Sequence, residues 1–438
     1  MKPLADRLYH GLTGEYPDEG ANRFVRNLGW IGFTFAAAKV ISALVNIMAG
    51  RLLGPEEYGK ISVMVSAGAA LTPFMLFGLN NAIVRYGVEP ARRNATFTLA
   101  GASFAVMASL TALVVLLERE RLSSFLGVTP EMMTLSLSYA LATGIFLIAA
   151  GTLQAEGSFS LRGLGEIAFS LVMAAAFFGG FFLMGRTYKA MAFSYIAAFG
   201  GVGLLLAVRA GLRTRPALPD RSGAGTILGF SAYSFGGGLS SFFLLNVQAL
   251  VLNAYLAPGE VGVYAAYYMA TINIAAYLGH TVGTVLFPKA SASTNRGRLW
   301  ALAVRTWLRL FPAALLLFLA GGAAVVTLMG REQYRLDPAL LLLFSAAGAL
   351  TMVQNSLGHI LFSEGISIAR PFMLASWAAG LLNLTGCLLL IPPLGVRGAA
   401  VSFIATYALT IAWYFRARRL YMEGPPVSPA PEDAGKSA

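Results

Sequence analysis

The sequence predicts an all-α integral membrane protein with twelve membrane-spanning helices in two six-helix lobes. Three observations lead to this fold class. The chain of 438 residues is 57% hydrophobic and only 12% charged, so it lacks the polar surface that a soluble protein of this size needs. Its charged residues are absent from a series of long apolar runs. The two halves also resemble each other at matching positions.

The apolar runs have the length of membrane-spanning helices. A helix needs about 20 apolar residues to cross the ~30 Å hydrocarbon core, and barrel strands are shorter and alternate in polarity. One run, 27–50, is interrupted only by Lys39. The others contain no Asp, Glu, Lys or Arg, and they are 61–84, 94–117, 132–155, 167–185, 190–208, 222–259, 261–288, 310–330, 338–363, 371–396 and 398–415.

The distribution of basic residues predicts the orientation. The side that would carry both termini has most of the Lys and Arg residues outside the spans. The positive-inside rule therefore predicts a multi-pass protein of the cytoplasmic (inner) membrane with cytoplasmic N- and C-termini. The net charge of +12 is then interpreted as orientation and contact with membrane lipids, and no nucleic-acid partner is expected.

The longest hydrophilic connection, at 209–221, divides the predicted spans into two sets of six. The predicted division is given by five ranges: a cytoplasmic N-terminal segment 1–26, an N-lobe 27–209, an inter-lobe linker 210–225, a C-lobe 226–416, and a C-terminal tail 417–438 expected to be disordered. Because each half has an even number of spans, the two copies should be related by an axis along the membrane normal.

Three pairs of segments carry the internal repeat. Residues 53–59 (LGPEEYG) match 256–262 (LAPGEVG), 155–157 (AEG) match 363–365 (SEG), and 190–197 (AMAFSYIA) match 398–405 (GAAVSFIA). In the first pair, Gly54 suits a helix C-terminus, Pro55 suits the first turn of the next helix, and Glu56 and Glu57 face its positive end. We interpret these residues as helix caps.

Several of these segments resemble a known family. They are 51–59 (RLLGPEEYG), 78–86 (GLNNAIVRY), 255–267 (YLAPGEVGVYAAY), 285–288 (VLFP), 381–384 (LLNL), 390–392 (LIP) and 395–400 (GVRGAA). They resemble the polysaccharide-biosynthesis exporters of the multidrug/oligosaccharidyl-lipid/polysaccharide exporter superfamily, and within it the Wzx-type flippases.

The resemblance implies a transporter rather than an enzyme. Such a flippase would move a polyprenyl-diphosphate-linked oligosaccharide from the cytoplasmic to the outer leaflet, by alternating access through a cationic central cavity. A polysaccharide polymerase and glycosyltransferases would be its functional partners, and no cofactor is implied.

Lys39 is the strongest candidate for substrate contact. It lies near the middle of the first predicted span, where a lysine costs about 2.5–3.5 kcal/mol on insertion scales. We expect it to neutralise the diphosphate during transit, with snorkelling or polar packing as the alternative. The sequence offers no acidic residue inside a span to pair with it.

Other basic residues form a second group of candidates. Arg305 and Arg309 lie four residues apart, on one face of the predicted ninth span. Arg298 lies near the same face, and Arg85 ends the second span. These arginines would attract an anionic head group, or they would be ordinary positive-inside charges that contact lipid phosphates.

Polar side chains within the spans form a third group. Candidates for sugar contact are Asn246, Asn253, His280, Gln354 and His359. The alternative is that they hydrogen-bond across helices. The histidines lack the spacing of a metal site, so no metal is expected. Pro73, Gly236, Gly237 and Gly238 are candidate hinges, with close helix packing as the alternative for the glycines.

Two other functions stay open. A cation-coupled multidrug antiporter of the same superfamily would normally use a carboxylate within the membrane, but Glu156, Glu166 and Glu364 are expected only at span ends or in loops. A membrane glycosyltransferase or polymerase would need catalytic acids in a sizeable loop, and no such loop is present between the predicted spans.

Overall fold

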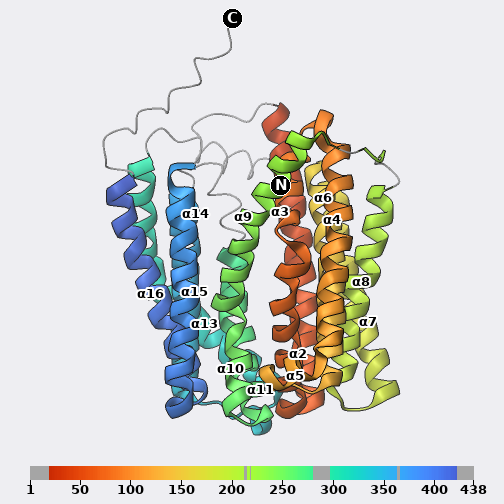
Figure 1. Ribbon diagram of the computed structural model, residues 1–438. Helices are drawn as coiled ribbons and strands as arrows, with labels where there is room; N and C mark the ends of the chain where they lie inside the picture. The colour runs from red at the N-terminus through yellow and green to blue at the C-terminus, as the bar shows by residue number, and fades with distance from the viewer. Residues whose placement is uncertain (1–18, 212–214, 218, 280–295, 363–365, 422–438) are drawn as a thin grey trace, which may run out of the picture. The chain divides into compact units, whose positions relative to one another are not determined.

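The computed structural model describes residues 19–211, 215–217, 219–279, 296–362 and 366–421 (Figure 1). Within these ranges the regular structure is helical and no strand is present. The first helices in chain order are α2 (Glu19–Leu76), α3 (Leu79–Tyr86), α4 (Pro90–Leu117), α5 (Arg119–Leu126), α6 (Pro130–Ala155), α7 (Phe159–Met184) and α8 (Tyr188–Gly211). The remaining elements are α9 (Arg221–Leu245), α10 (Val247–Tyr255), α11 (Pro258–Tyr268), the π-helical turn η1 (Met269–Asn273), α13 (Arg296–Tyr334), α14 (Pro338–Phe362), α15 (Ile366–Leu394) and α16 (Val396–Tyr421).

The all-α membrane architecture is confirmed. Eleven helices of the described residues are long and apolar enough to cross a membrane. The first of them, Gly32–Leu76, consists of two helices joined at Gly54, whose φ of 84° interrupts the helix. Glycine tolerates this left-handed conformation, and Pro55 next to it has no N–H to offer the preceding turn. The two limbs of α2 correspond to the first two predicted spans, so within the described residues the eleven candidate spans match the twelve predicted ones once α2 is divided at Gly54.

Several helix boundaries differ from the predicted ranges. The apolar run 222–259 contains two helices, because α9 ends at Leu245 and α10 begins at Val247 after Asn246. α16 continues to Tyr421, so residues 417–421 of the predicted tail are helical. α7 begins at Phe159, well before the predicted start of its span at 167. Hydropathy alone locates apolar residues but not the points at which the backbone leaves the helix.

The described chain groups into two compact units. The first unit comprises Met1–Ala266 and Val325–Arg335, and the second comprises Tyr267–Ala324 and Leu336–Ala438. The predicted lobes are defined by the sequence repeat, whereas these units are defined by spatial compactness. The two-lobe division therefore stays a prediction. The predicted repeat segment 363–365 lies outside the described residues.

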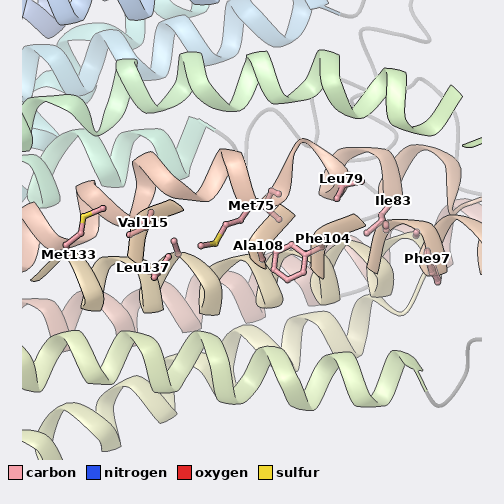
Figure 2. Close-up of a cluster of buried hydrophobic side chains, with 13 residues drawn as sticks. Met75, Leu79, Ile83, Phe97, Phe104, Ala108, Val115, Met133 and Leu137 are labelled. Carbon is pink, nitrogen blue, oxygen red and sulfur yellow. The ribbon is translucent and has the colours of Figure 1, made fainter. Parts of the chain in front are cut away.

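The core of the first unit joins α2, α3, α4 and α6. Met75, Leu79, Ile83, Phe104 and Met133 are buried in this cluster (Figure 2). In lipid the hydrophobic effect does not separate core from surface, so close packing of such side chains holds the helices together. Beside this core, α6, α7 and α8 pack against one another and α2 packs against α6 and α7 (Figure 1).

The second unit has its own core. Trp300, Leu357, Ile360, Tyr414 and Ala417 form a buried cluster contributed by α13, α14 and α16. Asp337 precedes α14 and accepts hydrogen bonds from the backbone N–H groups at the start of that helix. Its other carboxylate oxygen accepts a 2.8 Å hydrogen bond from Arg397 at the start of α16, so one side chain ties the ends of two helices together.

Candidate functional site

The interface between α2 and α7 is defined by contacts at two levels. At the first, Thr34 lies against Gly163, where an added Cβ would be 3.1 Å from the Thr34 Cβ. At the second, the Ser170 hydroxyl donates a 2.7 Å hydrogen bond to the carbonyl of Ala38 and lies 2.9 Å from the Ser42 hydroxyl. Residue numbers increase together along both helices, so α2 and α7 run in the same direction.

Glu166 and Lys39 lie between these two levels. Glu166 is three residues after Gly163 and four before Ser170, so it shares their helix face, which points at α2. Its side chain is buried, with 8% of the residue exposed. Lys39 follows Ala38 on α2 and is half-buried. The charges of Lys39 and Glu166 interact electrostatically, so a carboxylate stands beside the candidate lysine.

The expectation that no acidic residue within a span accompanies Lys39 is therefore wrong. Apart from the run that Lys39 interrupts, the predicted spans are defined as runs without charged residues. The predicted span 167–185 therefore has to begin after Glu166, whatever the true start of the helix. The helix itself begins at Phe159, and Glu166 lies within the candidate membrane span Phe159–Met184. The sequence signal that could have found it is the spacing of Gly163, Glu166 and Ser170 on one helix face.

Arg162 is the third charged group of this cluster. Its guanidinium donates a 2.5 Å hydrogen bond to the Gln154 side chain and a 3.2 Å bond to the Ala150 carbonyl, both from α6. It also lies 5.6 Å from the ring centre of Phe35 on α2, within the range of a cation–π interaction. Its charge reaches Glu166 electrostatically. We call Lys39, Arg162 and Glu166 the charge cluster.

Polar contacts continue along α2 beyond the charge cluster. The Asn46 amide donates a 2.9 Å hydrogen bond to the Ser42 carbonyl. The Tyr195 hydroxyl of α8 donates a 2.8 Å hydrogen bond to the Asn46 side-chain oxygen. Since Lys39, Ser42 and Asn46 recur at helical spacing, one face of α2 carries a polar track from the charge cluster to α8.

The other candidates of the first unit lie elsewhere. Arg85 is exposed, and its guanidinium lies 4.7 Å from the ring centre of Phe230. Asn253 donates a 2.6 Å hydrogen bond to the Gly127 carbonyl, which matches the structural alternative for this amide. Asn246 occupies the junction of α9 and α10, where its backbone N–H bonds the Phe242 carbonyl. The structure does not bring these residues to the charge cluster.

The remaining candidates belong to the second unit. Gln354 donates a 2.9 Å hydrogen bond to the Tyr414 hydroxyl, which links α14 to α16. His359 is half-buried on α14, and Arg305 and Arg309 are exposed on α13. His280 and the side chain of Arg298 lie outside the described residues. A role of these residues in substrate contact stays a prediction.

The candidate hinges lie on α2 and α9. A Cβ on Gly238 would lie 3.7 Å from the Pro73 Cβ, so the two positions are in ordinary contact. Helix α9 continues without a break through Gly236, Gly237 and Gly238. The backbone break near Pro73 follows at Phe77 and Gly78, whose φ angles are 44° and 72°. Bending at these positions stays a prediction.

The first pair of repeated segments meets in the structure. Gly59 is so close to Pro258 that an added Cβ would collide with the Pro258 carbonyl, and it would also lie 2.8 Å from the Gly262 nitrogen. Reciprocally, a Cβ on Gly262 would collide with the Pro55 carbonyl. Gly59 and Gly262 are equivalent in the repeat, as are Pro55 and Pro258. The contact therefore obeys the internal symmetry, and the capping interpretation missed it.

A segment at the end of α13 packs beside the first of these loops. The Tyr334 hydroxyl donates a 2.9 Å hydrogen bond to the Gly50 carbonyl, and its ring meets Tyr58 edge-on at 6.5 Å. Met329 and Tyr334 are fully buried. The reciprocal loop contact and the end of α13 thus form a closely packed end of the first unit, which we call the loop seal.

The fold is one found among membrane transporters. The chain is similar to an inward-facing multidrug resistance MATE family transporter of the MOP superfamily, with a TM-score of 0.66 at 14% identity over 88% of this chain and 96% of that one. It is similar to the lipid II flippase MurJ in an inward closed conformation, with a TM-score of 0.68 at 12% identity over 88% and 87%. It is also similar to the MATE multidrug transporter DinF-BH, with a TM-score of 0.60 at 13% identity over 91% and 96%.

These similarities define the class as a multi-pass membrane protein with a transporter fold. The family model described as "Polysaccharide biosynthesis protein" matches residues 47–335, more than half of the chain. The chain belongs to this family of polysaccharide biosynthesis proteins. No curated protein matches it.

Proposed function

We propose that this protein flips a polyprenyl-diphosphate-linked oligosaccharide from the cytoplasmic to the outer leaflet of the inner membrane. The observation that carries the proposal is Lys39, a cation within a membrane-spanning helix of a polysaccharide biosynthesis protein. Its polar track supplies amide and hydroxyl groups along the same helix. These groups match the head group of the proposed substrate, which carries phosphate charges for the lysine and sugar hydroxyls for the amide and hydroxyl groups.

The energetic role of Lys39 is to offset the burial of phosphate charge. An unpaired anion at the centre of a bilayer is strongly disfavoured, and so is an unpaired lysine. A lysine and a diphosphate that meet within the protein neutralise each other, and the barrier to transit of the head group falls. The polyprenyl chain is apolar and stays in the lipid.

The loop seal supports a transport cycle by alternating access. With cytoplasmic termini, the loops around Pro55 and Pro258 lie at the outer end of the protein. In alternating access, only one side of the protein is open at a time. A contact that closes the outer end is therefore expected in a conformation that gives access from the cytoplasm. The related structures described as inward-facing and inward closed are consistent with this assignment. The glycosyltransferases would build the glycan before transport, and the polymerase would act on it after transport.

A second candidate function gains support from Glu166. A buried carboxylate within a span is the feature that a cation-coupled multidrug antiporter would need, and MATE transporters share the fold. However, Lys39 and Arg162 both interact with this carboxylate, and adjacent cations repel Na⁺. The family match also favours the glycan substrate.

The test uses a strain that lacks this gene. We expect lipid-linked oligosaccharide to accumulate on the inner leaflet, and the wild-type gene to restore export. A Lys39→Ala variant should reach the membrane at the wild-type level but leave the intermediate stranded. A strain that exports its polysaccharide normally but becomes sensitive to cationic drugs would favour the antiporter instead.

A further inference from the structure

The charge cluster contains an anion where an anionic head group is expected to bind. Glu166 carries the same sign as a diphosphate, and it is buried on the α7 face that points at α2. The contacts of Thr34 with Gly163 and of Ala38 with Ser170 hold the two helices together on either side of it. A carboxylate in this position would weaken diphosphate binding unless it has a second purpose.

That purpose follows from the state without substrate. Burying a lysine without a compensating negative charge costs free energy. Removing one partner of a buried ion pair leaves the other charge with the same unfavourable free energy. Glu166 supplies negative charge to Lys39 when no substrate is bound, because the two groups interact through their charges. A second anion that approaches Lys39 can take over this interaction.

We propose that Glu166 is the internal counter-ion of Lys39, and that the substrate diphosphate replaces it. This inference rests on the proposed function. In the empty protein, Lys39 interacts with Glu166. When the head group enters, the diphosphate takes over Lys39 and Arg162, and Glu166 then repels the phosphates. When the head group leaves, Glu166 recovers Lys39. The exchange keeps Lys39 compensated at each stage and limits how tightly the substrate is held.

In this role Glu166 sets both affinity and release. A transporter gains nothing from a site that holds its substrate too strongly, since release then limits turnover. The repulsion between Glu166 and a bound ligand grows with the charge of the ligand, and a phosphate monoester, with about −1.5 to −2 at neutral pH, carries less charge than a diphosphate monoester. The carboxylate therefore weakens the binding of a diphosphate more than that of a monophosphate.

The experiment measures binding of farnesyl diphosphate to the full chain in lipid nanodiscs. Farnesyl phosphate and farnesol serve as probes with less and no charge. The proteins are the wild type, Glu166→Gln, Lys39→Met and the double variant. Glu131→Gln is the matched control, because Glu131 pairs with Lys189 at 2.6 Å outside the charge cluster. Turnover is followed with a labelled polyprenyl-diphosphate sugar in proteoliposomes.

We expect Glu166→Gln to bind farnesyl diphosphate about tenfold more tightly than the wild type, since a nearby repelling charge is removed from a partly desolvated site. Its turnover should fall, and its preference for the diphosphate over the monophosphate should widen, because the repulsion that is removed is larger for the ligand with more charge. Glu131→Gln should match the wild type in every measurement. Equal or weaker binding by Glu166→Gln, with binding still lost in Lys39→Met, would overturn the counter-ion role and leave the proposed function intact.

Two further outcomes separate the alternatives. If the wild type binds farnesyl diphosphate no better than farnesol, the diphosphate substrate itself is excluded, and the proposed function fails together with the counter-ion role. If Glu166→Gln does not fold, the double variant is compared with Lys39→Met. The proposal expects the double variant to be at least as stable, because Glu166 has no lysine left to compensate. A further loss of stability would show that Glu166 acts independently of Lys39, and this would contradict the proposal.

Discussion

Gly59 and Pro258 are packed so closely that the glycine could not carry a Cβ without displacing the proline backbone. Its repeat partner Gly262 stands in the same relation to Pro55. Each copy of the repeat thus contributes a glycine, and because glycine has no side chain, the backbone of the other copy can approach it closely. This reciprocal contact gives the repeated motif a role in closing one end of the first unit, in addition to capping its helices.

We predict that Gly59→Ala and Gly262→Ala each force the two loops apart. Overpacking of this kind typically costs about 1–3 kcal/mol, so thermal unfolding should begin at a lower temperature and export should fall. The double variant should lose less than the sum of the two, because both substitutions break one contact.

Gly225→Ala and Gly229→Ala are the controls for this experiment. Both glycines lie on exposed positions of α9 with no other atom within 4 Å of an added Cβ. They should export like the wild type and should unfold at the wild-type temperature or slightly above it, because Ala favours the helix more than Gly does. Wild-type behaviour of Gly59→Ala as well would show that the loops do not need their close approach.

Replacement of Tyr334 by Phe tests the rest of the loop seal. The change removes the hydroxyl that bonds the Gly50 carbonyl and keeps the ring against Tyr58. A hydrogen bond of this kind contributes about 0.5–1.5 kcal/mol, so a modest drop in the unfolding temperature in detergent is expected. A variant as stable as the wild type would mean that the buried ring alone holds this segment.

The basic residues of α13 can be separated from ordinary positive-inside charge. If Arg305 and Arg309 draw in the head group, changing both to Glu should impair export more than the same change at Arg416 and Arg419. The latter pair lies on the last turns of α16, where Arg416 is exposed. Arg418 is a poorer control, because it lies 6.0 Å from the ring of Trp300. Equal effects of the two double variants would assign all four arginines to lipid contact.

Asp337 provides a test that depends on pH. The Arg397 guanidinium and the N–H groups of Ala339 and Leu340 hold the pKa of Asp337 below its ordinary value. A lowered folded-state pKa contributes stability above the unfolded-state pKa of about 3.9, and this stability is lost as the pH falls through the folded value. Asp337→Asn should therefore lower the unfolding temperature slightly at neutral pH, because Asn keeps an N-cap acceptor but loses the charge that pairs with Arg397.

The difference between Asp337→Asn and the wild type should shrink as the pH falls below about 4, where the wild-type carboxyl also becomes neutral. Unfolding followed by intrinsic fluorescence across this range measures it. Arg397→Gln should reproduce part of the effect and should not add fully to Asp337→Asn. A difference that persists at low pH would assign the loss to packing rather than to charge.

The spans could be predicted from the sequence because uncharged apolar runs report directly on burial in lipid. The backbone breaks could not. The φ of 84° at Gly54 and the junction at Asn246 depend on local geometry, which hydropathy does not record. The start of α7 at Phe159 was missed because a helix can extend past the membrane or carry a charge inside it.

The site could be predicted only in part. Lys39 stands out because a lone charge interrupts an apolar run, whereas Glu166 escaped notice because it borders one. The repeat that contains Gly59 and Gly262 is visible in the sequence, but their contact joins segments far apart in the chain. A local sequence pattern does not show which distant segment of the backbone packs against a glycine.

The central claim is that the charge of Lys39 carries the diphosphate through the membrane. The most direct measurement is the flipping rate of a labelled polyprenyl-diphosphate sugar in proteoliposomes that contain the wild type, Lys39→Ala or Lys39→Arg. We predict that Lys39→Ala loses flipping and that Lys39→Arg retains much of it. Flipping by Lys39→Ala at the wild-type rate would contradict the claim.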